Sequence, residues 1–515
     1  MSGMFEPKND KANRKNEQTQ KELKAKRKKK IITISVITVL VLVATVAILL
    51  NSSFIRRTIP VVTIDGRGFS AAEFEYFFNS EYAEYLEFAS QFQDASMLPD
   101  DTQLLSAQIQ NPDTGETWAD FFSSMALASM TEITSLYNNA RDAGFRLSEE
   151  HMTEIDEELA LIAFQAEISG FPSTNMFLQR MFGNSINESV YRNILEFVTT
   201  ARIYSEHVRE SFEYTTDALA AHYNESKDDL DVFNFRMMYV DAEFNEDGLD
   251  EEAAAADAYD RAIEIADGIL SEEDFIMAAS GLGEHFFEPD ESTLYRVQGE
   301  SLEAELRTWL LDDVRDYGDI TVIDSGLGSA VIFFINRDDN NYRTVGMRQI
   351  LISREFIDPD EFPEGVVDPG YMEALDQAEA ALHETAELVQ TLFSAMGETE
   401  DALLELMLEY SDDTTPGGYY PNITKFQYQS NFISTFRVVS ALEDWLFDGN
   451  RAVGDTEMIY TNEFGYHLVY FTGFGDIFFE LIADDKMRTS DFFEWIDGLP
   501  KGEPVKHASM ILVHF

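Results

Sequence analysis

The first hydrophobic feature of the chain is an unbroken apolar run, residues 31–50, that contains no charged side chain. At about 1.5 Å per residue, a helix of this length covers roughly 30 Å, the thickness of a membrane's hydrocarbon core. Residues 1–30 hold 11 Lys and Arg against 4 Asp and Glu. This pattern predicts a single-pass anchor in the cell membrane with a cytoplasmic N-terminal tail and the bulk of the chain extracytoplasmic. A cleaved signal peptide is the alternative, but Leu50 runs into Asn51 without the small-residue site that cleavage needs.

After this run, the apolar spacing is first that of a strand and then that of helices. Residues 59–64 predict a strand, and Asp65 with Gly66 predicts a turn. Ser70 and Glu73 have the spacing of a capping box, which predicts a helix beginning at the residue after Ser70.

The next hydrophobic stripe has helical spacing, with intervals of four and three residues. Its members are Trp118, Phe122, Ala126, Met130, Ile133, Tyr137 and Ala140. Gly144 is expected to end this helix, and further helices are expected to begin near residues 148, 185–188 and 214–217. Residues 51–228 therefore predict an α-helical domain.

From residue 229 onward, short apolar strands alternate with acidic helices, and the pattern occurs twice. Seven residues recur at a constant offset of 136. In the first copy they are Trp309, Leu310, Asp312, Arg315, Gly318, Asp319 and Ile323, and in the second they are Trp445, Leu446, Asp448, Arg451, Gly454, Asp455 and Ile459. Two α+β domains that arose by duplication, residues 229–340 and 341–475, explain this pattern.

The charge balance narrows the class of partners. The chain has a formal charge of −58. Without residues 1–30 it has 26 basic and 91 acidic residues, which gives a formal charge of −65. A field of this sign repels nucleic acid, so no nucleic-acid partner is expected, whereas cationic polypeptides and divalent cations are attracted. A surface that only confers solubility explains the same charge. The chain has no cysteine, which excludes disulfides and a cysteine nucleophile.

The sequence lacks the motifs of cofactor and metal chemistry. It contains no Walker loop, dinucleotide glycine pattern, His-Glu-x-x-His helix or nucleophile elbow, so neither a cofactor nor a metal is predicted. The acidic stretch 353–372 has three prolines but not the spacing of an EF-hand, so it predicts an exposed loop.

Four short pieces of the second copy stand in a characteristic order. They are Arg348–Ile352, Tyr410–Asp413 with the glycines at 417 and 418, Trp445–Phe447, and Gly465–Val469. Together they resemble the PpiC-type parvulin peptidyl-prolyl cis-trans isomerases, and residues 61–228 look like the chaperone module of SurA-like and PrsA-like foldases. The resemblance implies a mostly antiparallel sheet flanked by helices, with an apolar pocket for the proline ring and polar groups behind it.

The resemblance assigns roles to four residues. His467 falls on the family's pocket histidine, Asp413 on the acid that faces the substrate carbonyl, and Phe447 on the aromatic wall. Tyr420 is predicted to be a second substrate-binding residue beside Phe447. Gln349 falls where the family usually carries the first of two histidines; its amide cannot titrate but can bridge as donor and acceptor. Without the resemblance, His467 on its apolar strand would be an ordinary partly buried histidine.

The first copy lacks this set of polar residues. Met237 stands where the second copy has Gln349 and, in the ungapped alignment, Val331 stands where it has His467. We therefore expect a catalytically silent domain that can still bind extended peptides.

Residues 476–515 predict a helix and then a strand at residues 510–515, which in SurA-like proteins returns to the amino-terminal module, here near residues 61–64. The predicted fold class is α+β multidomain: a transmembrane helix, a SurA-like helical chaperone module and two tandem parvulin-like domains. The predicted function is a membrane-anchored foldase that isomerises and chaperones unfolded or proline-containing exported polypeptides. The alternative is a non-catalytic holdase or assembly scaffold.

Overall fold

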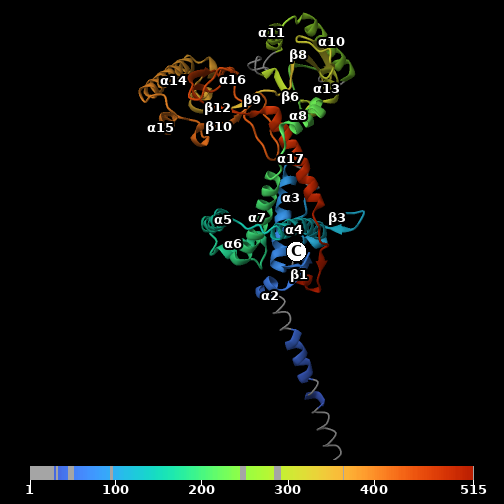
Figure 1. Ribbon diagram of the computed structural model, residues 1–515. Helices are drawn as coiled ribbons and strands as arrows, with labels where there is room; N and C mark the ends of the chain where they lie inside the picture. Colours follow the sequence, from blue (N-terminus) through green and yellow to red (C-terminus); the bar gives the residue numbers. More distant parts are fainter. Residues whose placement is uncertain are drawn as a thin grey trace, which may run out of the picture. The chain divides into compact units, whose positions relative to one another are not determined.

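The computed structural model describes residues 28–30, 33–43, 52–92, 97–243, 251–282, 292–326, 328–363 and 365–513. The chain divides into two compact units (Figure 1). Residues Met1–Phe212 with Phe492–Phe515 form one, which we call the helical unit, and Glu213–Asp491 form the other, which we call the two-sheet unit. Among the residues that the structure describes, helices and four small sheets form a mixed α+β structure.

The expected fold class is wrong in one part, the predicted transmembrane helix. Residues 33–43 are helical. Within the described part of the chain, no helix is both long enough and apolar enough to cross a membrane. Residues 1–27 of the predicted tail, and 31–32 and 44–50 of the predicted anchor, lie outside the described residues.

The helical unit combines helices with a three-stranded and a two-stranded antiparallel sheet. Its elements are α2 (Ser53–Thr58), β1 (Pro60–Ile64), β2 (Arg67–Ser70), α3 (Ala71–Ser90), η2 (Leu105–Ala107), β3 (Ile109–Asn111), β4 (Glu116–Thr117), α4 (Trp118–Asp142), α5 (Glu149–Ile168), α6 (Thr174–Phe182), α7 (Glu188–Glu210), β13 (Val505–Lys506) and η7 (Ala508–Leu512). The last residues of α17 (Phe478–Gly498) also belong to this unit.

The first strand of the helical unit forms as predicted, and it pairs with a second strand that was not predicted. β1 and β2 pair through a turn in which Asp65 (φ 45°) and Gly66 (φ 81°) both take left-handed backbone conformations. The hydroxyl of Ser70 accepts a hydrogen bond from the amide of Glu73, and the Glu73 carboxylate accepts one from the amide of Ser70 at 2.8 Å. The predicted strand, turn and capping box are confirmed.

The predicted apolar stripe forms the buried face of α4. Trp118, Phe122, Ala126 and Met130 are buried there in one core with side chains of β1, α3 and α7. Gly144, with a φ of 74°, follows the end of the helix. The predicted helix and its buried face are confirmed.

The C-terminal segment joins the core of the helical unit through a different element from the one predicted. β13 pairs antiparallel with β1, and Lys506 lies opposite Val62. Residues 508–512 form η7 instead of the predicted strand 510–515, because this turn directs Leu512, which is 2% exposed, into the core. Residues 514–515 lie outside the described residues.

The two-sheet unit contains the remaining elements. They are α8 (Thr216–Glu225), α9 (Lys227–Leu230), β5 (Val232–Asp241), α10 (Glu251–Gly268), α11 (Glu272–Ser280), β6 (Leu294–Gln298), η3 (Gly299–Ser301), α13 (Ala304–Leu310), β7 (Ile320–Asp324), β8 (Gly328–Asp338), β9 (Arg343–Ser353), η4 (Pro359–Glu361), η5 (Gly365–Val367), α14 (Pro369–Ala395), α15 (Glu400–Tyr410), η6 (Pro416–Gly418), β10 (Tyr419–Ile423), α16 (Ser440–Leu446), β11 (Thr456–Thr461), β12 (Gly465–Ile477) and the first part of α17.

Two four-stranded antiparallel sheets with matching strand order organise this unit. The first sheet has the order β6-β5-β8-β7, and the second has the order β10-β9-β12-β11. One face of the first sheet packs on α10 and α11 and the other on α13. The second sheet is covered in the same way by α14 and α15 on one face and by α16 on the other.

The sequence repeat marks the same local structure beside each sheet. The Arg315 guanidinium lies over the Trp309 ring, 4.5 Å from its centroid, and donates to the Trp309 carbonyl at 3.2 Å. Arg451 does the same with Trp445, at 3.9 Å and 3.1 Å. A glycine with a positive φ follows each pair. The repeated residues therefore join the tryptophan helix to the next strand in both copies.

The pairing register corrects the predicted counterpart of His467. His467 lies opposite Ile459 in the second sheet, and Ala330 lies opposite Ile323, the counterpart of Ile459, in the first. The histidine position of the first sheet is therefore occupied by Ala330 and not by Val331.

The length of one turn causes this difference. Four residues connect the paired positions 324 and 329, whereas five connect 460 and 466. An ungapped alignment therefore slips by one residue after the turn, and a slip of one residue exchanges the two faces of a strand.

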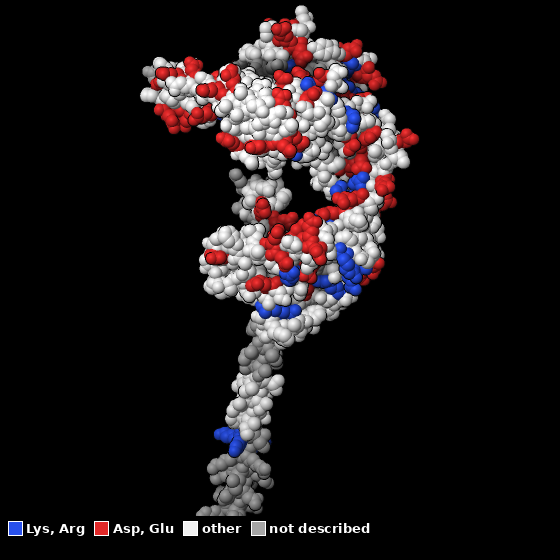
Figure 2. All heavy atoms as spheres, turned by 60° about the vertical axis from the view of Figure 1, so that its left-hand side comes forward, with Lys and Arg blue, Asp and Glu red and all other residues white. Residues whose placement is uncertain are grey.

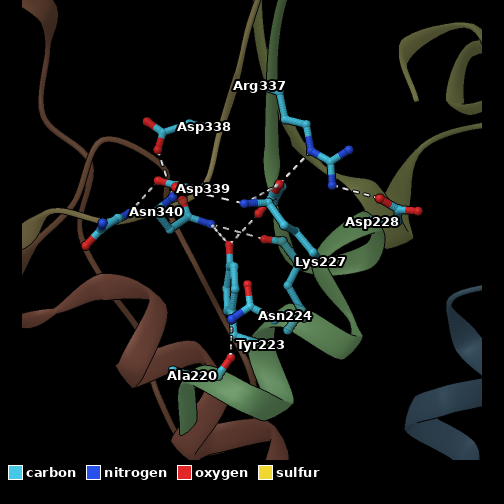
Figure 3. A network of polar contacts seen from close by, with 12 residues as sticks. Ala220, Tyr223, Asn224, Lys227, Asp228, Arg337, Asp338, Asp339 and Asn340 are labelled. Carbon is cyan, nitrogen blue, oxygen red and sulfur yellow. Dashed lines mark hydrogen bonds and ion pairs between the residues drawn. The ribbon is translucent and has the colours of Figure 1, made fainter. Parts of the chain in front are cut away.

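A buried polar network joins the short helices before the first sheet to its strands (Figure 3). Asp231, which is fully buried, accepts hydrogen bonds from the Tyr223 hydroxyl at 2.9 Å and from Arg337 Nε at 2.5 Å. Asn340, in the left-handed region with a φ of 55°, donates to the Tyr223 hydroxyl at 2.8 Å. These contacts link α8, the residue before β5 and the segment after β8.

Candidate active site

The candidate site lies on the face of the second sheet that packs against α16. Gln349 on β9 lies opposite Val469 on β12, and His467 is two residues along β12 on the same face. Long side chains in such a diagonal arrangement can touch. The alternate positions, Ile350 and Leu468, belong to the core beneath α14 and α15.

Five polar side chains form a hydrogen-bonded chain on this face. His467 Nδ1 is 2.9 Å from Gln349 Oε1, and Gln349 Nε2 donates to Asp413 Oδ2 at 2.7 Å. The Tyr420 hydroxyl donates to the same oxygen at 2.9 Å. At the other end, the Thr461 hydroxyl is 3.0 Å from His467 Nε2.

The hydrogen-bond partners assign the tautomer of the imidazole. An amide oxygen only accepts, so His467 Nδ1 carries the proton and donates it to Gln349. Nε2 is then the acceptor for the Thr461 hydroxyl. Gln349 accepts through its oxygen and donates through its nitrogen, and in this way it joins the histidine to the carboxylate.

The loop after α15 holds Asp413 at the edge of β9. The Thr415 amide donates to Asp413 Oδ1 at 2.8 Å, and the Asp413 amide donates to Ser411 Oγ at 3.2 Å. The Asp412 amide donates to the Leu351 carbonyl of β9 at 2.8 Å. Backbone contacts therefore place this carboxylate beside the sheet.

Burial and hydrogen bonding set the charges of the site. Burial lowers the pKa of His467 to about 4, against a smaller opposing effect of the Asp413 charge. Burial also acts to raise the pKa of Asp413, but hydrogen bonds from Thr415, Gln349 and Tyr420 outweigh it and hold that pKa below its usual value. Burial raises the pKa of Tyr420. At neutral pH the site therefore combines a neutral imidazole, a carboxylate and a neutral phenol.

These groups line a cavity of about 770 Å³, a volume typical of small-ligand sites. Its apolar lining residues are Met347, Leu351, Phe436, Val438, Val439, Leu442 and Phe464. Ser292, which precedes β6 of the first sheet, also lines it. The cavity thus has a polar base and mainly apolar walls.

The structure brings together Gln349, Asp413, Tyr420 and His467 but not Phe447. Phe447 follows α16, and its ring packs edge-on against Tyr342 at 5.6 Å. Besides Tyr420, the aromatic rings that line the cavity are those of Phe436 and Phe464, and Phe436 meets the Tyr420 ring at 90° and 5.3 Å. Phe436 lies in an irregular segment without periodic apolar spacing, so no pattern in the sequence identified it.

In the first sheet, the corresponding positions are part of a hydrophobic core. Met237 and Ala330 pack in one cluster with Phe235, Trp309 and other apolar side chains. A polar chain like that of the second sheet therefore cannot form at these positions.

The chemistry available to the cavity is that of hydrogen bonds, the Asp413 carboxylate, two further charged side chains in the lining, Arg437 and Glu463, and apolar walls. In the described part of the chain, no group of three or more His, Cys, Asp or Glu side chains is placed to hold a metal ion. Such a cavity suits a reaction that changes the conformation of a bound peptide without breaking a covalent bond.

No protein-family model and no curated protein matches this chain. Among solved structures, it is similar to the 1.70 Å crystal structure of peptidylprolyl isomerase (PrsA) from Bacillus anthracis, with 13% sequence identity and a TM-score of 0.21. The match covers 49% of this chain and 94% of that chain. At this TM-score the similarity carries no argument about this chain, so its function has to be inferred from the geometry of the site.

Proposed function

We propose that the two-sheet unit is a parvulin-type peptidyl-prolyl cis-trans isomerase that acts on proline-containing segments of unfolded polypeptides. The observation that carries the proposal is the chain of Gln349, Asp413, Tyr420 and His467 at the base of an apolar cavity of about 770 Å³. The cavity offers apolar walls to a proline ring and polar groups to the adjoining amide. The order of residue pieces that resembles PpiC-type parvulins is a second, separate support.

The reaction requires stabilisation of a twisted amide. Rotation about the X-Pro bond has a barrier of about 20 kcal/mol and takes roughly 10 to 100 s without a catalyst. Resonance places negative charge on the carbonyl oxygen of the planar amide, and this charge falls as the bond twists. A carboxylate beside that oxygen, the role we propose for Asp413, destabilises the planar form more than the twisted form.

The other side chains of the hydrogen-bonded series would keep the Asp413 carboxylate ionised and in place. Gln349 and Tyr420 donate to Asp413, and His467 orients Gln349. The apolar walls would exclude water, which strengthens the effect of a fixed charge.

The test is the rate of cis-trans isomerisation of an Ala-Pro tetrapeptide with the purified full-length protein. Asp413→Asn removes the charge with little change in shape, and we expect it to lower kcat/KM by at least about ten-fold. Ala330→Ser, at the histidine position of the first sheet, is the matched control and should leave the rate unchanged. A folded wild-type protein that gives no acceleration would refute the proposed activity.

A second candidate function is a holdase or assembly scaffold without catalysis. Gln349 favours it, because a glutamine cannot titrate where the parvulin family usually carries a histidine. Suppression of the aggregation of an unfolded protein, without acceleration of the tetrapeptide, would support this candidate.

The surface charge supports polypeptide clients over nucleic acid. On the face shown in Figure 2, Asp and Glu predominate over Lys and Arg on both units. Such a surface attracts cationic unfolded chains and repels phosphates. The resemblance to SurA-like and PrsA-like foldases points to exported polypeptides as clients and to a chaperone role for the helical unit.

A further inference from the structure

The cavity of the proposed isomerase has one wall with little regular structure. This wall segment, residues 424–439, connects β10 to α16 and contributes Gln427, Phe436, Arg437, Val438 and Val439 to the lining. Its strand-like pairing is limited to isolated bridges, Ile423 with Phe436 and Gln429 with Ser434. The other backbone hydrogen bonds of the segment, such as those from Thr424 N to the Phe436 carbonyl and from Thr435 N to the Tyr428 carbonyl, stay within the segment or reach the flanking elements β10 and α16, so side chains fix its position against the rest of the unit.

The wall segment also has an open space behind it. A second cavity, of about 630 Å³, is lined by residues 426–432 together with residues of η3 and α17, and Gln427 lines both cavities. Between the two cavities, Phe426, Tyr428 and Ile433 pack with Phe478 and Ile482 of α17, so part of the segment is held from outside the second sheet.

Arg296, on β6 of the first sheet, connects the two ends of the wall segment. Its Nη1 donates to the carbonyl of Lys425 at the start of the segment. The same nitrogen lies 2.9 Å and 2.8 Å from the two carboxylate oxygens of Glu443, on the helix that follows the segment. The side chains of Arg296 and Glu443 are only 16% and 12% exposed. Glu443 is next to Leu442, which lines the first cavity.

A buried carboxylate on α17 holds the middle of the wall segment. Asp485, which is 2% exposed, accepts hydrogen bonds from the Tyr428 hydroxyl at 2.7 Å and from the Ser430 hydroxyl at 3.1 Å. Both anchors, Arg296 and Asp485, lie outside the sequence copy that contains the proposed site.

We infer that the first-sheet copy, which lacks the polar residues of the site, sets the substrate affinity of the second through Arg296. Arg296 is a positioning residue: it holds both ends of the wall segment, and the segment then presents Phe436, Val438 and Val439 to the bound peptide. The inference rests on the proposed function, because it assigns a role to the wall of that same cavity.

The experiment compares full-length variants by three measurements. Binding of a fluorescein-labelled Ala-Pro pentapeptide gives Kd, the tetrapeptide assay gives kcat and KM, and hydrogen exchange reports the protection of amides in residues 424–439. We expect Arg296→Met to raise Kd and KM by at least about ten-fold, because removing one partner of a buried pair leaves the other unpaired. We expect kcat to change less than KM, and exchange in the wall segment to become faster.

Two further variants separate positioning from general stability. Lys486→Met removes another ion pair between the first-sheet copy and α17, the 2.8 Å contact with Glu300, whose partners are 34% and 41% exposed. It should leave Kd unchanged. The double variant Arg296→Glu with Glu443→Arg restores opposite charges and should recover part of the affinity that Arg296→Met loses.

The outcomes distinguish this inference from the proposed function. Suppose that the wild-type protein binds and isomerises the peptides and that Arg296→Met has the same Kd, KM and hydrogen exchange. This result would overturn the inference but not the proposed function. A wild-type protein that neither binds nor isomerises would overturn the proposed function. In that case, unchanged exchange of residues 424–439 in Arg296→Met would overturn the positioning role as well.

Discussion

Replacing Gln349 with Met would give the second sheet the residue that the first sheet carries at the same register position. The change removes the hydrogen bond of 2.7 Å to Asp413 and the contact of 2.9 Å with His467. A hydrogen bond to a charged group contributes about 1.5 to 3 kcal/mol, and an unsatisfied buried donor costs about 1 to 3 kcal/mol. His467 is 4% exposed and borders the cavity, so water is a poorer acceptor for it than the fixed amide oxygen. Allowing for the apolar gain of Met, we expect the free energy of unfolding to fall by about 2 to 4 kcal/mol.

The assay is urea unfolding followed by tryptophan fluorescence, together with tetrapeptide isomerisation. Met237→Leu, at the same register position of the first sheet, is the control and should cost less than about 1.5 kcal/mol because it conserves volume. Gln349→His should preserve the series of hydrogen bonds from His467 to Asp413, because imidazole can donate at one nitrogen and accept at the other. A Gln349→Met protein with wild-type stability and wild-type kcat/KM would refute the reasoning.

Two further predictions follow from the buried groups. Because the folded pKa of His467 is about 4 and its ordinary value is 6.5, the unfolded chain binds a proton between these pH values that the folded chain does not; this histidine should therefore lower the free energy of unfolding by up to about 3 kcal/mol as the pH falls from 6.5 to 4. Urea unfolding across this range should show a smaller loss in His467→Asn, and parallel curves for the two proteins would contradict the prediction. Leu512→Ala should destabilise the helical unit by about 2 to 4 kcal/mol, since the side chain is 2% exposed, whereas Ile511→Ala, at 72% exposure, should cost little. Thermal unfolding of the two variants checks this, and equal losses would show that the C-terminal segment does not complete the core.

Local signals in the sequence predicted local structure well. The capping box at Ser70, the turn at Asp65 and the stripe on α4 depend on residues within a few positions of one another, and all three are present.

The predictions that differ from the structure depend on contacts between residues that are far apart in the sequence. Phe436 enters the cavity because an irregular segment folds over the sheet, and Phe447 turns to Tyr342 instead. Leu512 lies in η7 and packs in the core with residues more than 300 positions away in the sequence. The anchor was predicted from the length of an apolar run, whereas none of the helices in the described part of the chain is long and apolar enough to cross a membrane.

The one-residue difference between the two hairpin turns has a consequence for protein engineering. A transplant of the site into the first sheet that followed the ungapped numbering would place histidine at Val331, on the wrong face of β8. The register directs the graft to Ala330 and Met237. Ser325, whose hydroxyl donates to the Gly328 carbonyl at 2.9 Å, already supplies a counterpart of the Thr461 hydroxyl. The first sheet therefore has the backbone positions that the site requires, but the shorter turn shifts the histidine position by one residue in the numbering.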